Sequence, residues 1–161
     1  MDKEILNLPL TLPTKAVLSN RIAKSALSEG IAEPNGRPSE ALFNLYERWG
    51  KGGAGLLISG NVMVDKDHLV NANVMIAENE DFLADYKTLA DKAQAHGTHL
   101  WMQINHPGRQ APVYLDKAPV SCSNVKMPSK LYLEPRPLAE EEIEELIERY
   151  GTAALVAKNL V

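Results

Sequence analysis

The sequence predicts an α/β fold with a parallel sheet, and three observations support this prediction. Three apolar runs that end in polar residues, at 20–28, 54–61 and 98–105, have the composition of β-strands. Amphipathic stretches lie between them, and an alternation of strands and helices is typical of parallel βαβ units. The run at 54–59 is apolar without alternation, which indicates a strand that is covered on both faces.

Residues 1–19 predict a hairpin cap that precedes the main sheet. Pro9 and Pro13 interrupt a loosely alternating pattern, and proline restricts a strand to an edge. A strand is expected at 20–27, followed by a loop at 29–38 that is rich in turn residues. A loop of that length at the end of a strand is a common place for function.

The first helix is predicted to begin after Ser39, whose hydroxyl is suited to accept a backbone N–H of the first turn. Leu42, Leu45, Tyr46 and Trp49 then recur at helical spacing. Glycines at 50, 52 and 53 end the helix, because glycine accepts the left-handed conformation of a helix C-terminus.

The remaining segments complete three βα units. After the second strand, a polar loop at 65–79 leads to a helix at 81–95 and a third strand at 98–105. An excursion over 106–137 is too long to be a simple connector, and a third helix runs from 139 to 161. Since a (β/α)8 barrel has eight strands and about 250 residues, we predict a partial TIM barrel. It forms one domain, 1–161, with the hairpin cap at 1–19 and units 1 to 3 at 20–161.

Composition excludes several classes of protein. The chain has 161 residues, 45% of them hydrophobic and 24% charged, and a net charge of -4 without a basic cluster. We therefore expect no nucleic-acid partner. No apolar stretch is long enough to span a membrane, and the N-terminus lacks a secretory signal. Cys122 is the one cysteine, so we expect a reducing, cytoplasmic location and treat Cys122 as an ordinary loop residue.

The polar residues that end the three strands define the expected site. Ser25 and Ser28 close the first strand, Gly60 and Asn61 follow the second, and Gln103 lies within the third. The carboxyl ends of parallel strands meet at one rim, which is where ligands bind in this class of fold.

Three motifs together resemble the Old Yellow Enzyme family, which are FMN-dependent NADH:flavin oxidoreductases and ene-reductases built on TIM barrels. The motifs are Asn20-Arg21-Ile22 with Ser25-Ala26-Leu27-Ser28, then Gly55-Leu56-Leu57-Ile58-Ser59-Gly60-Asn61, then Gln103-Ile104-Asn105-His106-Pro107-Gly108-Arg109. They occur in the family's order and cover nearly the whole chain. The opening Leu8-Pro9-Leu10-Thr11-Leu12-Pro13 resembles the family's N-terminal hairpin.

The resemblance implies that the first strand lies along the flavin ring. Ser25, Ala26, Leu27 and Ser28 match the segment that contacts FMN in the family. Ser28 stands where the family has a Thr or Cys near a ring carbonyl, and its hydroxyl can donate a hydrogen bond to a flavin oxygen. Gly30 replaces a substrate-facing Tyr of some members, so that contact is absent.

The second and third strands complete the implied cofactor contacts. Gly60 keeps room for the ring, and Asn61 replaces a small residue, which leaves a role for its side chain open. Gln103 matches a glutamine that pairs with the flavin pyrimidine edge, because an amide offers a donor and an acceptor together. His106 and Arg109 fit a turn that orders the rim.

The resemblance also implies what this chain does not contain. The family's substrate-activating pair lies on strand 4, beyond the end of the chain, and the loops that bind the flavin phosphate lie on later strands. We therefore identify no catalytic residue here. The implied cofactors are FMN with NADH or NADPH as the hydride donor, and the implied partners are a small-molecule acceptor and an oligomer or complementing chain. The alternative is a catalytically incomplete fragment or half-barrel module that needs another chain.

Two other readings of the strand ends are weaker. Lys24 at a strand end could form a Schiff base if it were desolvated, but it could equally point outwards between strand and helix. A zinc site from His96, His99 and His106 is disfavoured, because a helix end and a strand start diverge and no fourth ligand is evident. His68 is expected to be solvent-exposed in its polar loop, so we predict no metal site.

Overall fold

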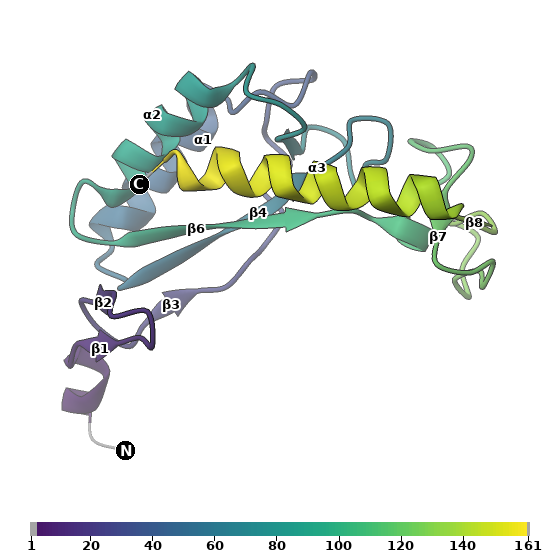
Figure 1. Ribbon diagram of the computed structural model, residues 1–161. Helices are drawn as coiled ribbons and strands as arrows, with labels where there is room; N and C mark the ends of the chain where they lie inside the picture. The colour runs from purple at the N-terminus through teal and green to yellow at the C-terminus, as the bar shows by residue number, and fades with distance from the viewer. Residues whose placement is uncertain (1–2, 161) are drawn as a thin grey trace.

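The computed structural model describes residues 3–160 and shows an open parallel sheet with helices on one face (Figure 1). The sheet contains β3 (Ala23–Lys24), β4 (Leu56–Met63), β5 (Met75–Ile76) and β6 (His99–Asn105). The other three strands pair with β4 in parallel. β6 follows one edge of β4, the short β3 pairs with the start of β4, and the short β5 pairs with its end. The predicted parallel α/β architecture of an unclosed barrel is confirmed.

The N-terminal hairpin is also present. A 3-10 turn, η1 (Lys3–Asn7), precedes β1 (Leu10–Thr11), which pairs antiparallel with β2 (Val17–Leu18). The hairpin projects from the end of the sheet at which the strands begin (Figure 1). His99 Nε2 lies 3.1 Å from the Val17 carbonyl oxygen and links the hairpin to β6.

Three helices cover the sheet. They are α1 (Glu40–Lys51), α2 (Leu83–Gln94) and α3 (Glu140–Lys158), all close to their predicted bounds. Ser39 caps α1 as predicted, because its Oγ accepts the Leu42 N–H at 3.2 Å. In Figure 1, α3 runs along β6, and α1 and α2 lie together beyond it. The helix predicted to run to 161 ends at Lys158, because the chain turns at Asn159; residue 161 itself lies outside the described residues. No helix within 3–160 is long and apolar enough to cross a membrane.

The core lies between the sheet and the helices. Its largest fully buried side chains include Tyr46 of α1, Tyr86 of α2, Leu57 and Val62 of β4, and Val156 of α3. Tyr86 donates its hydroxyl to the Ile76 carbonyl at 2.9 Å, so its polar atom is satisfied inside the core. The apolar positions that predicted α1 and α2 therefore face the sheet, whereas Ile143 and Ile147 of α3, which had the same role in its prediction, are exposed.

Two strand predictions require correction. The strand expected at 20–27 is hydrogen-bonded only at Ala23 and Lys24, and residues 25–29 continue without a ladder. The strand expected at 54–59 instead runs to Met63, so Ser59, Gly60 and Asn61 lie inside β4 rather than after it. The loop at 65–79 contains β5, which the sequence did not suggest because only two residues pair.

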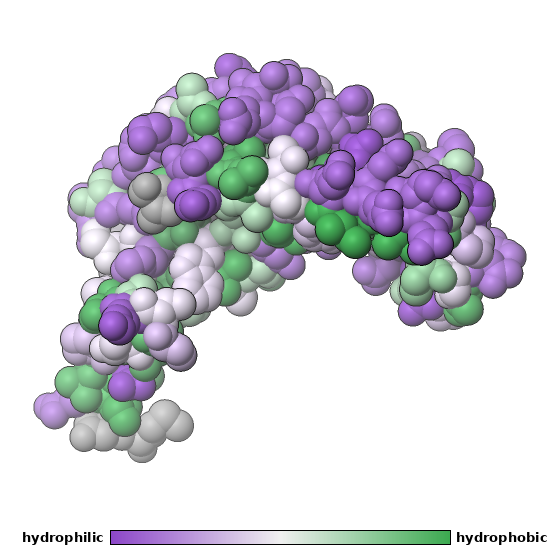
Figure 2. All heavy atoms as spheres, in the orientation of Figure 1, coloured by the Kyte–Doolittle hydropathy of each residue, from purple (hydrophilic) through white to green (hydrophobic). Residues whose placement is uncertain are grey.

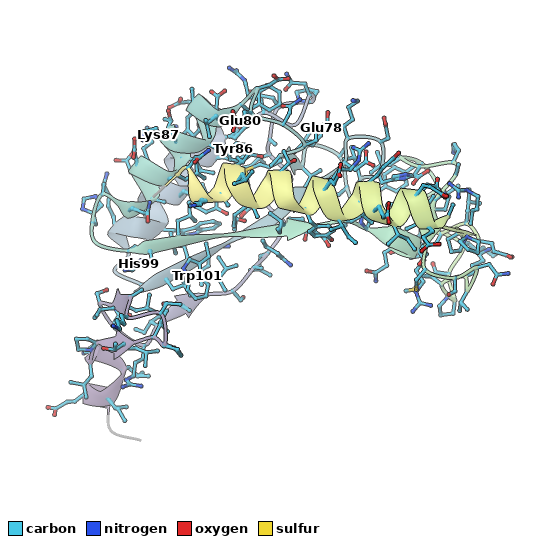
Figure 3. The ribbon with its side chains drawn as sticks, viewed as in Figure 1. Glu78, Glu80, Tyr86, Lys87, His99 and Trp101 are labelled. Carbon is cyan, nitrogen blue, oxygen red and sulfur yellow. The ribbon has the colours of Figure 1, made fainter. Side chains whose placement is uncertain are left out.

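The excursion at 106–137 folds back on itself beyond the carboxyl end of β6. It contains η2 (Gly108–Gln110) and the parallel pair β7 (Val120–Ser121) and β8 (Arg136–Pro137). The hairpin and the excursion project from opposite ends of the sheet, and Figure 2 shows a hollow between them. Trp101 of β6 points to this concave side, away from the helices, and is 46% exposed (Figure 3).

Candidate functional site

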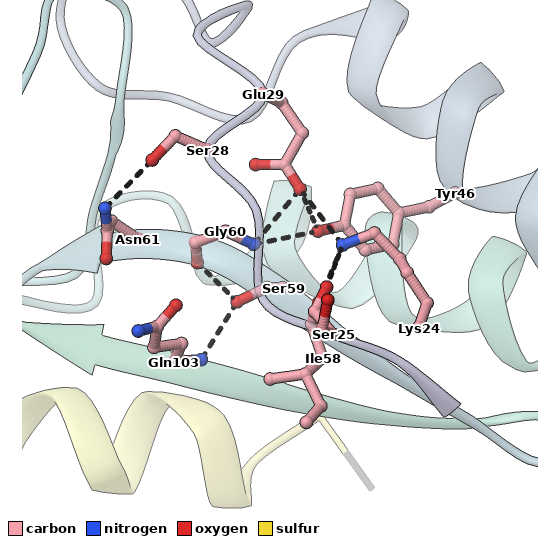
Figure 4. A network of polar contacts seen from close by, with 10 residues as sticks. All are labelled: Lys24, Ser25, Ser28, Glu29, Tyr46, Ile58, Ser59, Gly60, Asn61 and Gln103. Atoms are coloured by element: carbon pink, nitrogen blue, oxygen red, sulfur yellow. Dashed lines mark hydrogen bonds and ion pairs between the residues drawn. The ribbon is translucent and has the colours of Figure 1, made fainter. Parts of the chain in front are cut away.

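The structure brings together polar side chains from all three predicted strand segments (Figure 4). Asn61 Nδ2 donates to Ser28 Oγ at 2.9 Å. Asn61 and Gln103 are register partners across β4 and β6, so their side chains are on the same face of the sheet. The predicted meeting of the three segments at one rim is confirmed. The role of the Asn61 side chain, which the sequence left open, is to hold Ser28.

A β-bulge in β4 produces this alignment. The register shifts between Ile58 and Asn61, where β4 has one more residue than β6. Ser59 fills the irregularity: its hydroxyl donates to the Gly60 carbonyl at 2.8 Å and accepts the Gln103 N–H at 2.9 Å. Sequence reasoning missed this role, although a glycine inside an apolar strand is a known signal of a bulge.

A buried carboxylate holds the end of the first segment against the bulge. Glu29 Oε1 accepts the Gly60 N–H at 3.0 Å and the Tyr46 hydroxyl at 2.5 Å, and the side chain is 7% exposed. Burial and the Glu29 charge raise the pKa of Tyr46, so the hydroxyl remains a donor. The sequence predicts only a turn-rich loop at Glu29, because its partners lie 17 and 31 residues away.

Gly60 is required by this junction. A Cβ on Gly60 would collide with the Glu29 carboxylate and with the Leu27 carbonyl oxygen. The absence of a side chain therefore serves the close approach of residues 27–29 to β4. The sequence had suggested that it leaves room for a bound ring, and the structure supplies this nearer reason.

Lys24 points away from the rim, between the sheet and α1. Its Nζ donates to the Ile58 carbonyl at 2.9 Å and lies 4.5 Å from the centre of the Trp49 ring and 3.8 Å from Glu29. Desolvation lowers the pKa of Lys24, and the Glu29 charge partly opposes that effect. These contacts give the ammonium a structural role, so the Schiff-base reading loses its support.

The other residues that were predicted to contact the flavin ring are mostly exposed. Ser25, Leu27 and Ser28 are exposed and Ala26 is half-buried, with Leu27 64% exposed. Within residues 3–160, no hydrogen bond holds the side-chain amide of Gln103, which is exposed on the concave face. A free amide beside the Ser28–Asn61 pair presents donors and acceptors to a planar ring that carries both, so these residues fit the flavin edge implied above.

Three of the histidines diverge as predicted, and the fourth differs from its prediction. His99 and His106 stand at opposite ends of β6, and His96 is exposed beyond α2, so this set does not converge. The prediction that His68 is solvent-exposed is wrong: its side chain is 20% exposed and its Nδ1 lies 2.7 Å from Asp116 Oδ2. Asp116 belongs to the excursion, and sequence alone gave no indication that the excursion returns to this loop.

The turn after β6 orders the rim as expected. His106 Nδ1 accepts the Gly108 N–H at 3.1 Å, and Arg109 reaches the Val125 carbonyl at 3.5 Å while it stays exposed. An apolar pocket of about 480 Å³ lies elsewhere, between α2, α3 and β6. Gln103 and Asn61 do not line that pocket, so it does not coincide with the rim.

Comparisons with known proteins find related sequences. The sequence model of the NADH:flavin oxidoreductase / NADH oxidase family matches residues 6–160. The NADH-dependent flavin oxidoreductase iliE of Hypocrea jecorina is 34% identical over 94% of this chain and 43% of its own length. The NADH oxidase of Thermoanaerobacter brockii is 34% identical over 88% of this chain and 22% of its own.

A solved structure supports the same fold. The Old Yellow Enzyme homologue of Zymomonas mobilis superimposes with a TM-score of 0.86 over 96% of this chain and 45% of that protein, at 23% identity. At that identity the likeness concerns the fold alone. The chain therefore spans less than half the length of each of these three proteins.

Proposed function

The chain belongs to the NADH:flavin oxidoreductase / NADH oxidase family, and from that membership we propose that it supplies the flavin-ring part of an FMN site. The observation that carries the proposal is the convergence of Ser28, Asn61 and the free amide of Gln103 at one rim. The protein to which the site belongs is then an NADH-dependent oxidoreductase. A cytoplasmic location and a small-molecule acceptor belong to the same proposal.

Each side chain at the rim has a chemical task in this proposal. Gln103 donates and accepts at the pyrimidine edge, because its amide is the complement of an imide N–H beside a carbonyl. Ser28 accepts from Asn61, which leaves its hydroxyl proton free to donate to a ring oxygen and favour negative charge there. Asn61 fixes the position of Ser28, and the main chain at Ser25, Ala26, Leu27 and Gly60 borders the ring.

Bound FMN would supply hydride transfer, through its N5, from NADH to an activated alkene or similar acceptor. The residues described above bind and orient the ring for that chemistry. None of them is assigned to activation of the acceptor, since the family resemblance places that pair on a later strand.

The open sheet favours a second candidate, a half-barrel module that needs further strands. Among the described strands β6 pairs only with β4, so its outer edge leaves backbone donors and acceptors unpaired. Trp101 is also 46% exposed on the concave face. In this proposal a further segment or chain pairs with β6, and this chain alone shows no turnover.

A titration with FMN tests the first proposal. Purified protein is expected to quench FMN fluorescence in a saturable manner, and Gln103→Ala should weaken binding about tenfold, which corresponds to the loss of about 1.4 kcal/mol of hydrogen bonding. Gln110→Ala is the matched control, because Gln110 is an exposed glutamine whose side chain makes no hydrogen bond within residues 3–160.

The outcome separates the two candidates. Saturable binding that depends on Gln103 supports the flavin site, whereas no binding, or equal effects of the two substitutions, contradicts it. Native mass spectrometry of the same sample reports whether copies associate. A flavin-free monomer would leave only the half-barrel module.

A further inference from the structure

Three side chains with metal-binding atoms converge beyond the carboxyl ends of β4 and β6, apart from the rim residues assigned to flavin. Asp65 and His68 lie in the loop that follows β4, and His106 follows β6. Their carboxylate and imidazole atoms all lie within 4.8 Å of one another. Asp65 is 8% exposed and the histidines are half-buried, so the cluster is partly shielded from water.

The contacts of His68 prepare it as a ligand. Its Nδ1 lies 2.7 Å from Oδ2 of the buried Asp116, so Nδ1 is engaged by the carboxylate and Nε2 is the nitrogen left to bind a metal ion. Asp116 is itself held, because its Oδ1 accepts the Ala118 N–H at 2.8 Å. In a metal-binding histidine, the ring nitrogen that does not bind the metal usually donates a hydrogen bond to a carboxylate or similar acceptor, and this contact orients the ring.

The surroundings favour a cation and leave room for one. A pocket of about 220 Å³ is lined by the cluster and by Asp67, Glu142, Glu145 and Arg149. Glu142 is already paired with Arg136, so three other carboxylates share this pocket with one guanidinium. Arg149 lies 3.6 Å from Asp65 Oδ1, the oxygen that also accepts the Asp67 N–H, which leaves Oδ2 of Asp65 as the oxygen without a protein partner within residues 3–160.

Coordination requires two adjustments. Zinc bonds of about 2.0–2.2 Å place tetrahedral ligands about 3.3 Å apart, so the cluster must contract. His106 must also release the Gly108 N–H, which now occupies its Nδ1. Both changes involve the loop at 65–68 and the turn after β6 rather than the interior of the sheet.

We propose that Asp65, His68 and His106 form a binding site for a divalent transition-metal ion of the Zn²⁺, Co²⁺ or Ni²⁺ class. Two imidazoles and one carboxylate suit these ions, and a fourth position would open to the pocket. The ion would join the loop after β4 to the turn after β6, and through Asp116 it would also fasten the excursion. This proposal is independent of flavin binding.

Titration of chelator-stripped, untagged protein with CoCl₂ and ZnCl₂ tests the site. Cobalt should give a saturable visible absorption band at one ion per chain, and zinc should displace it. His68→Gln and His106→Gln are each expected to weaken binding at least about tenfold, as is Asp116→Asn, which keeps all three ligands but removes their outer support.

His96→Gln is the matched control, because His96 is exposed and distant in the fold from the cluster, and it should bind cobalt like the unaltered protein. Circular dichroism without metal checks that each variant folds, and Asp116→Asn decides the case if a ligand variant unfolds. A lack of stoichiometric binding, or binding that His68→Gln, His106→Gln and Asp116→Asn leave unchanged, would overturn the proposal and leave a hydrogen-bonded polar cluster.

Discussion

At the scale of single residues, the junction of Glu29 and Gly60 determines how closely the first strand segment approaches β4. The Glu29 carboxylate receives hydrogen bonds from Gly60 and Tyr46, and no space remains for a side chain at position 60. Ser28 is adjacent to Glu29 and bonded to Asn61. The position of the Ser28 hydroxyl at the rim therefore depends on a contact made one residue away.

Gly60→Ala is expected to destabilise the protein by about 1–3 kcal/mol, the usual cost of overpacking, because the new methyl group meets a carboxylate and a backbone carbonyl. Urea denaturation measures the free energy of unfolding. Gly151→Ala is the control: nothing lies near its added Cβ in α3, so it should stabilise by about 0.5–1 kcal/mol. Equal stabilisation by both substitutions would contradict the close junction.

Some site residues could be predicted and others could not, for a physical reason. Ser28 and Gln103 were predicted because they end or interrupt apolar runs and match a family motif. Glu29, Tyr46 and Ser59 act through contacts with residues distant in the sequence or across a bulge. No local pattern records such contacts, so the glutamate appeared to be an ordinary residue of a turn-rich loop.

At the scale of elements, the start of α3 is held by charge rather than by a Ser or Thr cap. Ala139 precedes the helix, and the Glu142 carboxylate accepts the Ala139 N–H at 2.7 Å. Arg136 of β8 donates two hydrogen bonds to the same carboxylate, each 2.7 Å long. This places a negative charge in the first turn, where the helix dipole favours it, and it ties β8 to α3.

These contacts predict a pH dependence for α3. They lower the pKa of Glu142 from 4.5 to about 2, with the Arg136 hydrogen bonds as the largest cause. Since the folded-state pKa is depressed, the stabilisation is present above pH 4.5 and is lost as the pH falls toward 2. Carbon-detected NMR of the Glu142 carboxyl should show this low pKa.

A pair of variants provides the check on that prediction. Glu142→Gln should lose less stability than the unaltered protein between pH 5 and pH 3 (about the range of ordinary carboxyl titration). Glu144→Gln, in the same turn but exposed and without a hydrogen bond or ion pair within residues 3–160, should decline as the unaltered protein does. A Glu142 titration near 4.5 would contradict the capping role.

The elements also show where sequence patterns succeed. The three helices were predicted because an amphipathic repeat is a local property of one segment, as in the Leu42–Tyr46–Trp49 series of α1. Strand lengths were less predictable, because a strand exists only where a neighbour pairs with it. Residues 25–29 stay outside the ladder, while β4 continues to Met63 because β6 follows it there.

At the scale of the whole molecule, the concave face of the sheet is open. The hairpin and the excursion frame this face, and Trp101 lies exposed on it (Figures 2 and 3). The partial barrel was predictable from three strands where eight are needed. The return of the excursion toward His68 was not, because Asp116 lies 48 residues further along the chain.

Tryptophan fluorescence can report on this open face. The chain has two tryptophans, so Trp49→Phe isolates Trp101 and Trp101→Phe isolates Trp49. Trp101 should emit at longer wavelength and be quenched by acrylamide more strongly than Trp49, which lies against Lys24 and Tyr46. If further strands cover the concave face, Trp101 emission should shift to shorter wavelength; a shielded Trp101 in the isolated monomer would contradict the open sheet.

The bulge in β4 has a consequence for how this protein can vary. Ile58 and Asn61 share the concave face although three positions separate them, because the additional residue reverses the alternation of side chains. Deletion of that residue would turn Asn61 toward the helices and expose Val62, which is fully buried. Substitutions in the segment between Ile58 and Asn61 should therefore be tolerated more readily in related proteins than insertions or deletions there.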